Sequence, residues 1–390
     1  MPYITHIHVE HCRNVRRIDI DLAEPRVAWP QPFRHLILTG PNGSGKSGVL
    51  EMVAEEIQEA VRPRDLQMRL FVGEENAVRW DCDSRDIPSA FANGDFIAAY
   101  QPARRGVRTK EVHGPSKWKR RKLSDVGVKQ EGVSTLHQFM VNKHVQMTYA
   151  ASEGDRATAE RVEAWLTAFE NHLRRIAEDD ELSMLYDSDA FAFRFRRGDG
   201  YIFDLNTLAD GHAAVLALLA ELLIRVDLVQ STRRDFTFEP DGIIIVDEIE
   251  THLHPSLQEQ VLPFLTDLFP RFQFIVATHS PAVIASVPNA VVYDIKKRTQ
   301  TLSDRFRGVR YGTLMTEHFG ISSEIDLDST EKLVRLRELS SILARTTDEE
   351  TEFNSLAEEL SGRSRTLAVE VWMIREGLGK PTRETTGRKQ

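Results

Sequence analysis

Cysteine is scarce in this sequence, with only Cys12 and Cys82 among 390 residues. Two thiols cannot build a disulfide framework or a cysteine-rich zinc site unaided. So few cysteines are typical of a protein in a reducing compartment. A long apolar run is also missing, because the longest, residues 213–224, contains Glu221 and is too short to cross a bilayer. We therefore predict no membrane partner and a cytoplasmic location.

Several other signals are missing. The first residues, MPYITHIHVEHCRNVRR, alternate apolar and polar side chains and contain no apolar signal core, so we expect no secretory leader. The sequence has no internal repeat and no sustained heptad. The net charge of −9 excludes a wholly basic nucleic-acid coat, while 41% hydrophobic and 28% charged residues are typical of a globular chain.

One glycine-rich motif stands out, GPNGSGKS at residues 40–47. It fits the phosphate-binding pattern G-x-x-x-x-G-K-[ST] and lies between an expected buried strand, residues 35–40, and an expected helix that begins near Lys46. Its backbone amides can surround phosphate oxygens, with Lys46 reaching the β- and γ-phosphates and the Ser47 hydroxyl ligating Mg²⁺. The residues predicted to bind nucleotide here are Gly40, Pro41, Asn42, Gly43, Ser44, Gly45, Lys46 and Ser47.

Two carboxylates follow a strongly apolar segment, IIIVDE at residues 243–248. A strand buried on both faces would place them at the carboxyl edge of a parallel sheet, where ligands bind in open α/β folds. There Asp247 would hold the Mg²⁺ shell and Glu248 would polarise the water that attacks a γ-phosphate. Two acids that merely cap the next helix are the alternative reading.

These motifs, with Ile249-Glu250-Thr251-His252-Leu253-His254-Pro255 and Ala277-Thr278-His279-Ser280 after them, resemble the Walker B, D-loop and H-loop series of the ABC ATPase superfamily. The resemblance is closest to the soluble branch that includes SMC, RecF and OLD-type ATPases, and extends to the anti-phage defence ATPases of Septu and retron systems. It covers the N-terminus to about residue 297. It implies an ATPase that uses ATP and Mg²⁺.

The resemblance assigns three further residues. His279 would contact the γ-phosphate as the switch histidine, and Gln101 would be the Q-loop residue that lies near the metal and the water. Arg13 matches an arginine that follows the first strand in the SMC-like branch, near the nucleotide. The predicted metal set is thus Ser47, Asp247 and Gln101, and the predicted catalytic set is Glu248, His279 and Gln101.

The segment LADGH, residues 208–212, occupies the place of the family's signature loop, usually L-S-G-G-Q. Gly211 keeps the close backbone approach, but Ala209 removes the serine hydroxyl and His212 replaces the glutamine. A signature acting in trans implies a head-to-head homodimer around two ATP molecules, or a higher even-numbered oligomer. The segment is also readable as the capped start of an ordinary core helix.

The alternating strands and helices predict an α/β fold, which by resemblance is an ABC ATPase head with a mostly parallel central sheet and an antiparallel β-lobe. A short inserted helical arm and a helical C-terminus would complete it. The expected divisions are an N-terminal ATPase lobe at 1–101, an inserted arm at 102–200, a C-terminal ATPase lobe at 201–297, a mainly helical region at 298–378 and a disordered tail at 379–390.

Residues 102–129 are strongly basic in an acidic chain. Residues 104–122 would contact nucleic-acid phosphates, or form a solvated loop. The C-terminal residues Leu333, Leu336, Leu339, Ile342 and Leu343 lie at helical spacing, and this stripe would either dock a partner or pack as core against the ATPase head.

Two functional hypotheses remain open. In the first, the chain is the ATPase switch of a bacterial anti-phage system that controls a separate effector such as a nuclease. In the second, it is a RecF-like DNA repair or maintenance ATPase that binds duplex DNA through the basic segment.

Overall fold

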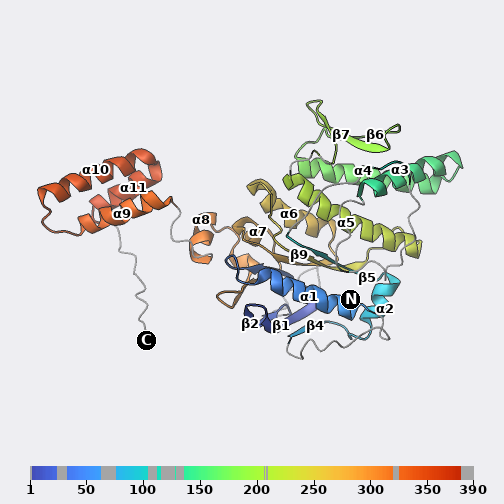
Figure 1. The fold of residues 1–390 in the computed structure, drawn as a ribbon, viewed down its shortest axis with the longest axis horizontal. Helices are drawn as coiled ribbons and strands as arrows, with labels where there is room; N and C mark the ends of the chain where they lie inside the picture. Colours follow the sequence, from blue (N-terminus) through green and yellow to red (C-terminus); the bar gives the residue numbers. More distant parts are fainter. Residues whose placement is uncertain are drawn as a thin grey trace. The chain divides into compact units, whose positions relative to one another are not determined.

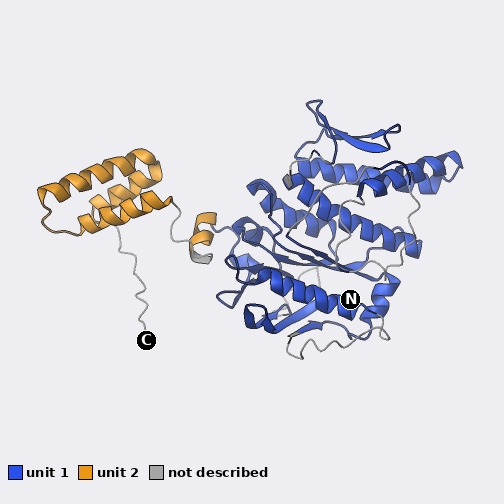
Figure 2. Ribbon diagram, in the orientation of Figure 1, with its two compact units in different colours: residues 1–309 blue, residues 310–390 orange. Residues whose placement is uncertain are grey.

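The computed structural model of the protein describes residues 2–23, 33–62, 76–103, 112–115, 128, 136–205, 207, 210–318 and 325–378. The chain forms two compact units, residues 1–309 and residues 310–390 (Figure 2). The predicted tail at 379–390 and most of the basic segment at 104–122 lie outside the described residues.

The first unit is built on a six-stranded sheet (Figure 1). Five neighbouring strands run parallel and one edge strand is antiparallel. In spatial order the strands are β12 (Thr299–Leu302), β11 (Ala290–Asp294), β3 (His35–Thr39), β10 (Phe272–Ala277), β9 (Asp241–Val246) and β5 (Phe96–Gln101). The four central parallel strands are buried along nearly their whole length, as their continuous apolar sequences require.

Helices cover both faces of this sheet. On one face α1 (Lys46–Ala60) lies between the main sheet and a small antiparallel sheet of β2 (Val15–Asp21), β1 (Ile4–Cys12) and β4 (Asn76–Trp80) (Figure 1). On the other face lie α5 (Asp210–Arg233) and α6 (Pro255–Leu268). Two short helices, α2 (Ile87–Asn93) and α7 (Pro281–Ser286), and the 3-10 turn η4 (Ser303–Arg305) complete the core.

The inserted arm packs over α5. It consists of α3 (Leu136–Ser152), α4 (Arg156–Ala177) and a second antiparallel sheet of β6 (Ser183–Asp187), β7 (Ala192–Arg196) and β8 (Ile202–Phe203). Its apolar core joins these elements to α5 through residues such as Phe169, Phe195 and Leu216. Because both sides of α5 are covered, this helix is apolar almost all round, with Val215, Leu216, Leu219 and Leu222 buried.

The second unit is helical. It contains α8 (Tyr311–Thr313), the π-helical turn η5 (Leu314–His318), α9 (Leu327–Ser340), α10 (Thr347–Arg363) and α11 (Arg365–Arg375). Leu333, Leu336 and Leu339 are buried in the shared core of α9, α10 and α11, whereas Leu343 is exposed. Most of the predicted apolar stripe is therefore accounted for by a core within this unit, which differs from both predicted roles, docking a partner and packing against the head.

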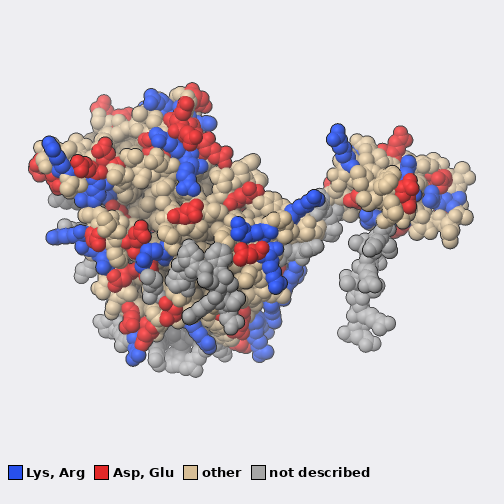
Figure 3. All heavy atoms as spheres, turned by 180° about the vertical axis from the view of Figure 1, so that it is seen from behind, with Lys and Arg blue, Asp and Glu red and all other residues tan. Residues whose placement is uncertain are grey.

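These observations confirm the predicted fold class, an α/β architecture with a mostly parallel central sheet, an antiparallel lobe, a short inserted helical arm and a helical C-terminus. Charged side chains of both signs are interspersed on the face seen in Figure 3. No helix in the part of the chain that the structure describes is long and apolar enough to cross a bilayer.

Candidate functional site

The phosphate-binding loop connects β3 to α1. Gly45 caps the helix in the left-handed region, with a φ of 103°, and a Cβ atom there would lie 2.2 Å from Cγ2 of Val15. Only glycine fits both constraints. Pro41, Asn42 and Gly43 are exposed at the top of the loop, whereas Ser44 and Ser47 are half-buried. The loop thus presents its backbone outward at the N-terminus of a fifteen-residue helix, which is a favourable site for phosphate.

Lys46 lies buried below this loop. Its ammonium donates hydrogen bonds to the carbonyl oxygens of Gly40 at 3.0 Å and Pro41 at 3.3 Å, and lies 2.7 Å from Nε2 of His279. Burial lowers the pKa of Lys46, while the nearby carboxylates of Asp247 and others oppose that shift. Because an ammonium can only donate, Nε2 of His279 accepts this hydrogen bond, which requires a neutral imidazole.

Two predicted metal residues meet because β5 and β9 are paired in the sheet. The main-chain N–H of Asp247 donates to the carbonyl oxygen of Gln101 at 2.9 Å. The Gln101 side chain is fully buried, and its two amide atoms have no hydrogen-bond partner among the described residues. An unsatisfied buried amide costs free energy unless a ligand completes it. The predicted metal set of Ser47, Asp247 and Gln101 would offer oxygen donors, the ligand type that Mg²⁺ prefers.

The described residues contain no cluster of three or more His, Cys, Asp or Glu side chains placed to hold a metal ion. This is compatible with the predicted set, which uses one carboxylate, one hydroxyl and one amide and leaves the remaining positions to phosphate and water.

Glu248 follows Asp247 in a backbone conformation with a φ of 46°. This left-handed residue lies just beyond β9 and starts a tight turn, in which the Thr251 hydroxyl donates to Oε2 of Glu248 at 3.2 Å. His279 comes from the end of β10, the neighbouring strand. Burial and the adjacent Lys46 lower the pKa of His279, and nearby carboxylates oppose them. The structure thus brings Lys46, Glu248 and His279 to one edge of the sheet.

Gly211 and His212 open α5, while Leu208 and Ala209 lie outside the described residues. A Cβ atom on Gly211 would lie 2.6 Å from the carbonyl oxygen of His252, so the start of α5 packs closely against the turn that follows Glu248. His212 is half-buried, and burial lowers its pKa. The signature role of these residues stays a prediction.

Arg13 lies beside the first turn of α1, where its guanidinium pairs with Glu51. The adjacent Asn14 donates its side-chain amide to the carbonyl oxygen of Gly43, which ties the β1–β2 turn to the phosphate-binding loop. A cavity of about 490 Å³ borders this loop, and its lining also includes Arg16, Lys296 and Arg298. These cations would favour the approach of an anionic ligand.

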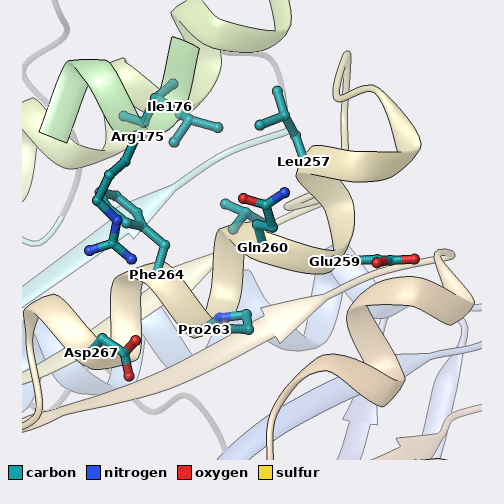
Figure 4. Close-up of a pocket in the computed structure, with 10 residues that line it drawn as sticks. Arg175, Ile176, Leu257, Glu259, Gln260, Pro263, Phe264 and Asp267 are labelled. Carbon is teal, nitrogen blue, oxygen red and sulfur yellow. The ribbon is translucent and has the colours of Figure 1, made fainter. Parts of the chain in front are cut away.

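A second hollow lies between α4, α5 and α6 and contains none of the predicted site residues (Figure 4). The guanidinium of Arg175 lies 4.8 Å from the ring centroid of Phe264 at this place. None of the residues that line this hollow belongs to the phosphate-binding loop.

Some residues of the site escaped the sequence analysis. Asn14 fixes the loop, Asp294 ends β11 beside Gly40, and Glu250 accepts the main-chain N–H of His279. A polar side chain directly after a buried parallel strand is the signal that would have found Asp294. Glu250 gave a weaker signal, because only the tertiary contact distinguishes it from a helix-capping acid.

The chain is similar to a class of proteins, the soluble ABC-type ATPases of the SMC, RecF and OLD-like branch. The sequence profile of a family described as "AAA domain, putative AbiEii toxin, Type IV TA system" matches residues 106–285.

The particular relatives include a retron ATPase and a Septu protein. The chain is 30% identical over 129 residues to "Retron Ec83 probable ATPase" of Escherichia coli, covering 33% of this chain and 24% of that protein. It is 27% identical over 121 residues to "Septu protein PtuA" of Bacillus mycoides (strain KBAB4), covering 30% of this chain and 16% of that protein. The matched segments thus span about a quarter or less of these relatives.

Solved structures with a similar chain course include the SmcHead bound to the C-winged helix domain of ScpA, with a TM-score of 0.41 and 12% identity over 77% of this chain and 97% of that one. Another is cbiO1 from Clostridium perfringens, with a TM-score of 0.37 and 11% identity over 77% of this chain and 90% of that one.

Proposed function

We propose that this chain is a Mg²⁺-dependent ATP-binding and ATP-hydrolysing switch that dimerises head to head around ATP. We further propose that it serves as the ATPase subunit of an anti-phage defence complex and controls a separate effector such as a nuclease. The observation that carries the ATPase proposal is the convergence of Lys46, Gln101, Asp247 and His279, from four different parts of the chain, at one edge of the sheet. The similarity to retron and Septu proteins supports the defence role.

The chemistry follows from these positions. Lys46 would exchange its bonds to the loop carbonyls for phosphate oxygens, and the loop amides would neutralise the remaining charge. Glu248 would orient the attacking water, because in-line attack on a γ-phosphate needs a positioned nucleophile. His279, neutral and already beside Lys46, would contact the γ-phosphate. Ser47, Asp247 and Gln101 would hold Mg²⁺, which would supply charge neutralisation for the phosphates.

The dimer follows from the incomplete site in one chain. Gly211 and His212 at the start of α5 would face the γ-phosphate bound by a second copy, an isologous arrangement. Hydrolysis would remove that bridging group and loosen the pair, so nucleotide state would be read out as assembly state.

The test compares Glu248→Gln with the wild-type protein and with Glu259→Gln, which makes the same chemical change at an exposed position on α6. Glu248→Gln should bind ATP, hydrolyse it far more slowly and remain dimeric in size-exclusion chromatography with ATP. Glu259→Gln should behave as wild type. Wild-type turnover by Glu248→Gln would refute the assignment of the base, and a monomer at high concentration with a nonhydrolysable ATP analogue would refute the dimer.

The defence role has its own test. The tagged protein, expressed from its native operon, should co-purify with a neighbouring gene product whose activity depends on the nucleotide state of this chain. Stimulation of ATP hydrolysis by duplex DNA in the isolated protein, lost at high salt, would instead favour the repair hypothesis.

A further inference from the structure

Glu250 is the third acidic residue after β9 and lies in the turn that follows this strand. The turn begins at Glu248, with a φ of 46°, and reaches His252, with a φ of 66°. Two main-chain hydrogen bonds hold it, from Thr251 N to Glu248 O and from Leu253 N to Glu250 O, each at 2.9 Å. Such paired left-handed residues fix the backbone tightly, and the direction of the Glu250 side chain is fixed with it.

This turn is tied to the segment that carries His279. The main-chain N–H of His279 donates to Oε1 of Glu250, and the main-chain N–H of Ile249 donates to the carbonyl oxygen of Ala277 at 3.2 Å. One side-chain bond and one main-chain bond therefore join the turn after β9 to the end of β10. Because the Glu250 carboxylate binds the main-chain N–H of His279 itself, this hydrogen bond fixes the position of the backbone from which the imidazole extends.

The other side of the same segment is also anchored. The Ser280 hydroxyl donates to Oε1 of Gln258 at 2.6 Å, and the Gln258 amide donates to the carbonyl oxygen of Leu253 at 2.9 Å. His279 thus lies between two polar attachments, and its imidazole reaches Lys46 at 2.7 Å. Gln258 belongs to α6 and carries no charge, which makes Glu250 the charged member of the pair.

The second oxygen of Glu250 is a further observation. Oε2 is buried and has no hydrogen-bond partner among the described residues. The carboxylate also acts electrostatically on both Lys46 and His279. A carboxylate that served only to cap a turn would gain nothing from burial beside these two groups, because burying a charge is costly unless it is paired.

We infer that Glu250 is a positioning residue for ATP hydrolysis, which holds His279 at the γ-phosphate through the bond to its main-chain N–H. This inference rests on the proposed function. It assigns Glu250 no contact with substrate, and it places its effect on the hydrolytic step rather than on nucleotide binding.

The test is a double-mutant cycle of Glu250→Ala and His279→Ala, with Glu250→Gln as the conservative variant and Glu259→Gln as the surface control. Removing a group that orients another typically costs roughly 10- to 100-fold in activity. Glu250→Ala should therefore lower kcat by that factor and leave KM for ATP within about twofold of wild type. Glu250→Gln, whose amide oxygen can accept the same N–H, should recover most of the loss, and the double variant should be no slower than His279→Ala.

A second measurement does not depend on turnover. Hydrogen–deuterium exchange of the peptide that contains residues 272–280 should accelerate in Glu250→Ala and stay at the wild-type rate in Glu250→Gln and Glu259→Gln. Unchanged exchange in Glu250→Ala, or losses that multiply in the double variant, would overturn the inference. Failure of the proposed function is distinct, because it would appear as a wild-type protein that neither binds nor hydrolyses ATP.

Discussion

The strand that leads to the phosphate-binding loop begins with a buried histidine, and we predict that this residue makes the protein acid-labile. His35 accepts a hydrogen bond at Nδ1 from the main-chain N–H of Phe274 at 3.1 Å and packs between the rings of Phe33 and Phe274. Burial lowers its pKa from 6.5 to about 4. The perturbation is a drop in pH from 7 to 5.

The sign follows from proton linkage. Between pH 6.5 and about 4 the unfolded His35 binds a proton that the folded one does not, so the free energy of unfolding falls as the pH falls through this window. At pH 7 both states are mostly neutral and the effect is small. At pH 5 the unfolded imidazole is almost fully protonated and the folded one almost neutral, which corresponds to a loss of about 2 kcal/mol relative to pH 7.

The assay is urea unfolding at both pH values, followed by circular dichroism and fitted with one transition for each compact unit. His35→Asn is the reference, because its side-chain oxygen can accept the Phe274 N–H but does not titrate. All other titrating groups are common to both proteins and cancel. The wild type should lose about 2 kcal/mol more than the variant. Equal losses in the two proteins would refute the reasoning.

Three further predictions concern the site and its support. Lys46→Ala should abolish ATP binding, measured with a fluorescent ATP analogue, and an unchanged affinity would contradict the phosphate-binding assignment. Gly211→Ala would bring its Cβ to 2.6 Å from the carbonyl oxygen of His252, so it should cost about 1–3 kcal/mol in urea unfolding and weaken ATP-dependent dimerisation, and a variant as stable as wild type would argue against this packing. Arg225→Met should lower the free energy of unfolding by about 3–5 kcal/mol in thermal unfolding, because it leaves the buried Glu221 carboxylate, which Arg225 contacts at 2.7 Å, without its ion-pair partner. A surface arginine changed to methionine should cost almost nothing.

Local sequence was sufficient for the elements that bracket the motifs. The glycine-rich loop lies between β3 and α1 as the pattern required, and the apolar run before Asp247 is β9. Each of these depends on residues within about ten positions of one another, where periodicity and turn chemistry act directly. The roles assigned to Gln101, His279 and Arg13 came from resemblance and still await their tests.

The C-terminal stripe shows the limit of such patterns. The helical spacing predicted which face of α9 is apolar, the face with Leu333, Leu336 and Leu339. The same spacing is expected of a face that docks a partner and of a face that packs in a core. Only the packing of α9 against α10 and α11 separated the two.

The sequence by itself determined a glycine-rich loop between a strand and a helix, a strand followed by two carboxylates, and the alternating order of strands and helices. The tertiary structure decided that β5 lies beside β9, which places Gln101 against Asp247, and that Glu250 reaches the backbone of His279. The physical reason is that a buried parallel strand has the same continuous apolar sequence pattern wherever it lies in a sheet. Strand order is set by long-range packing, and the contacts that depend on it exist only once the sheet has formed.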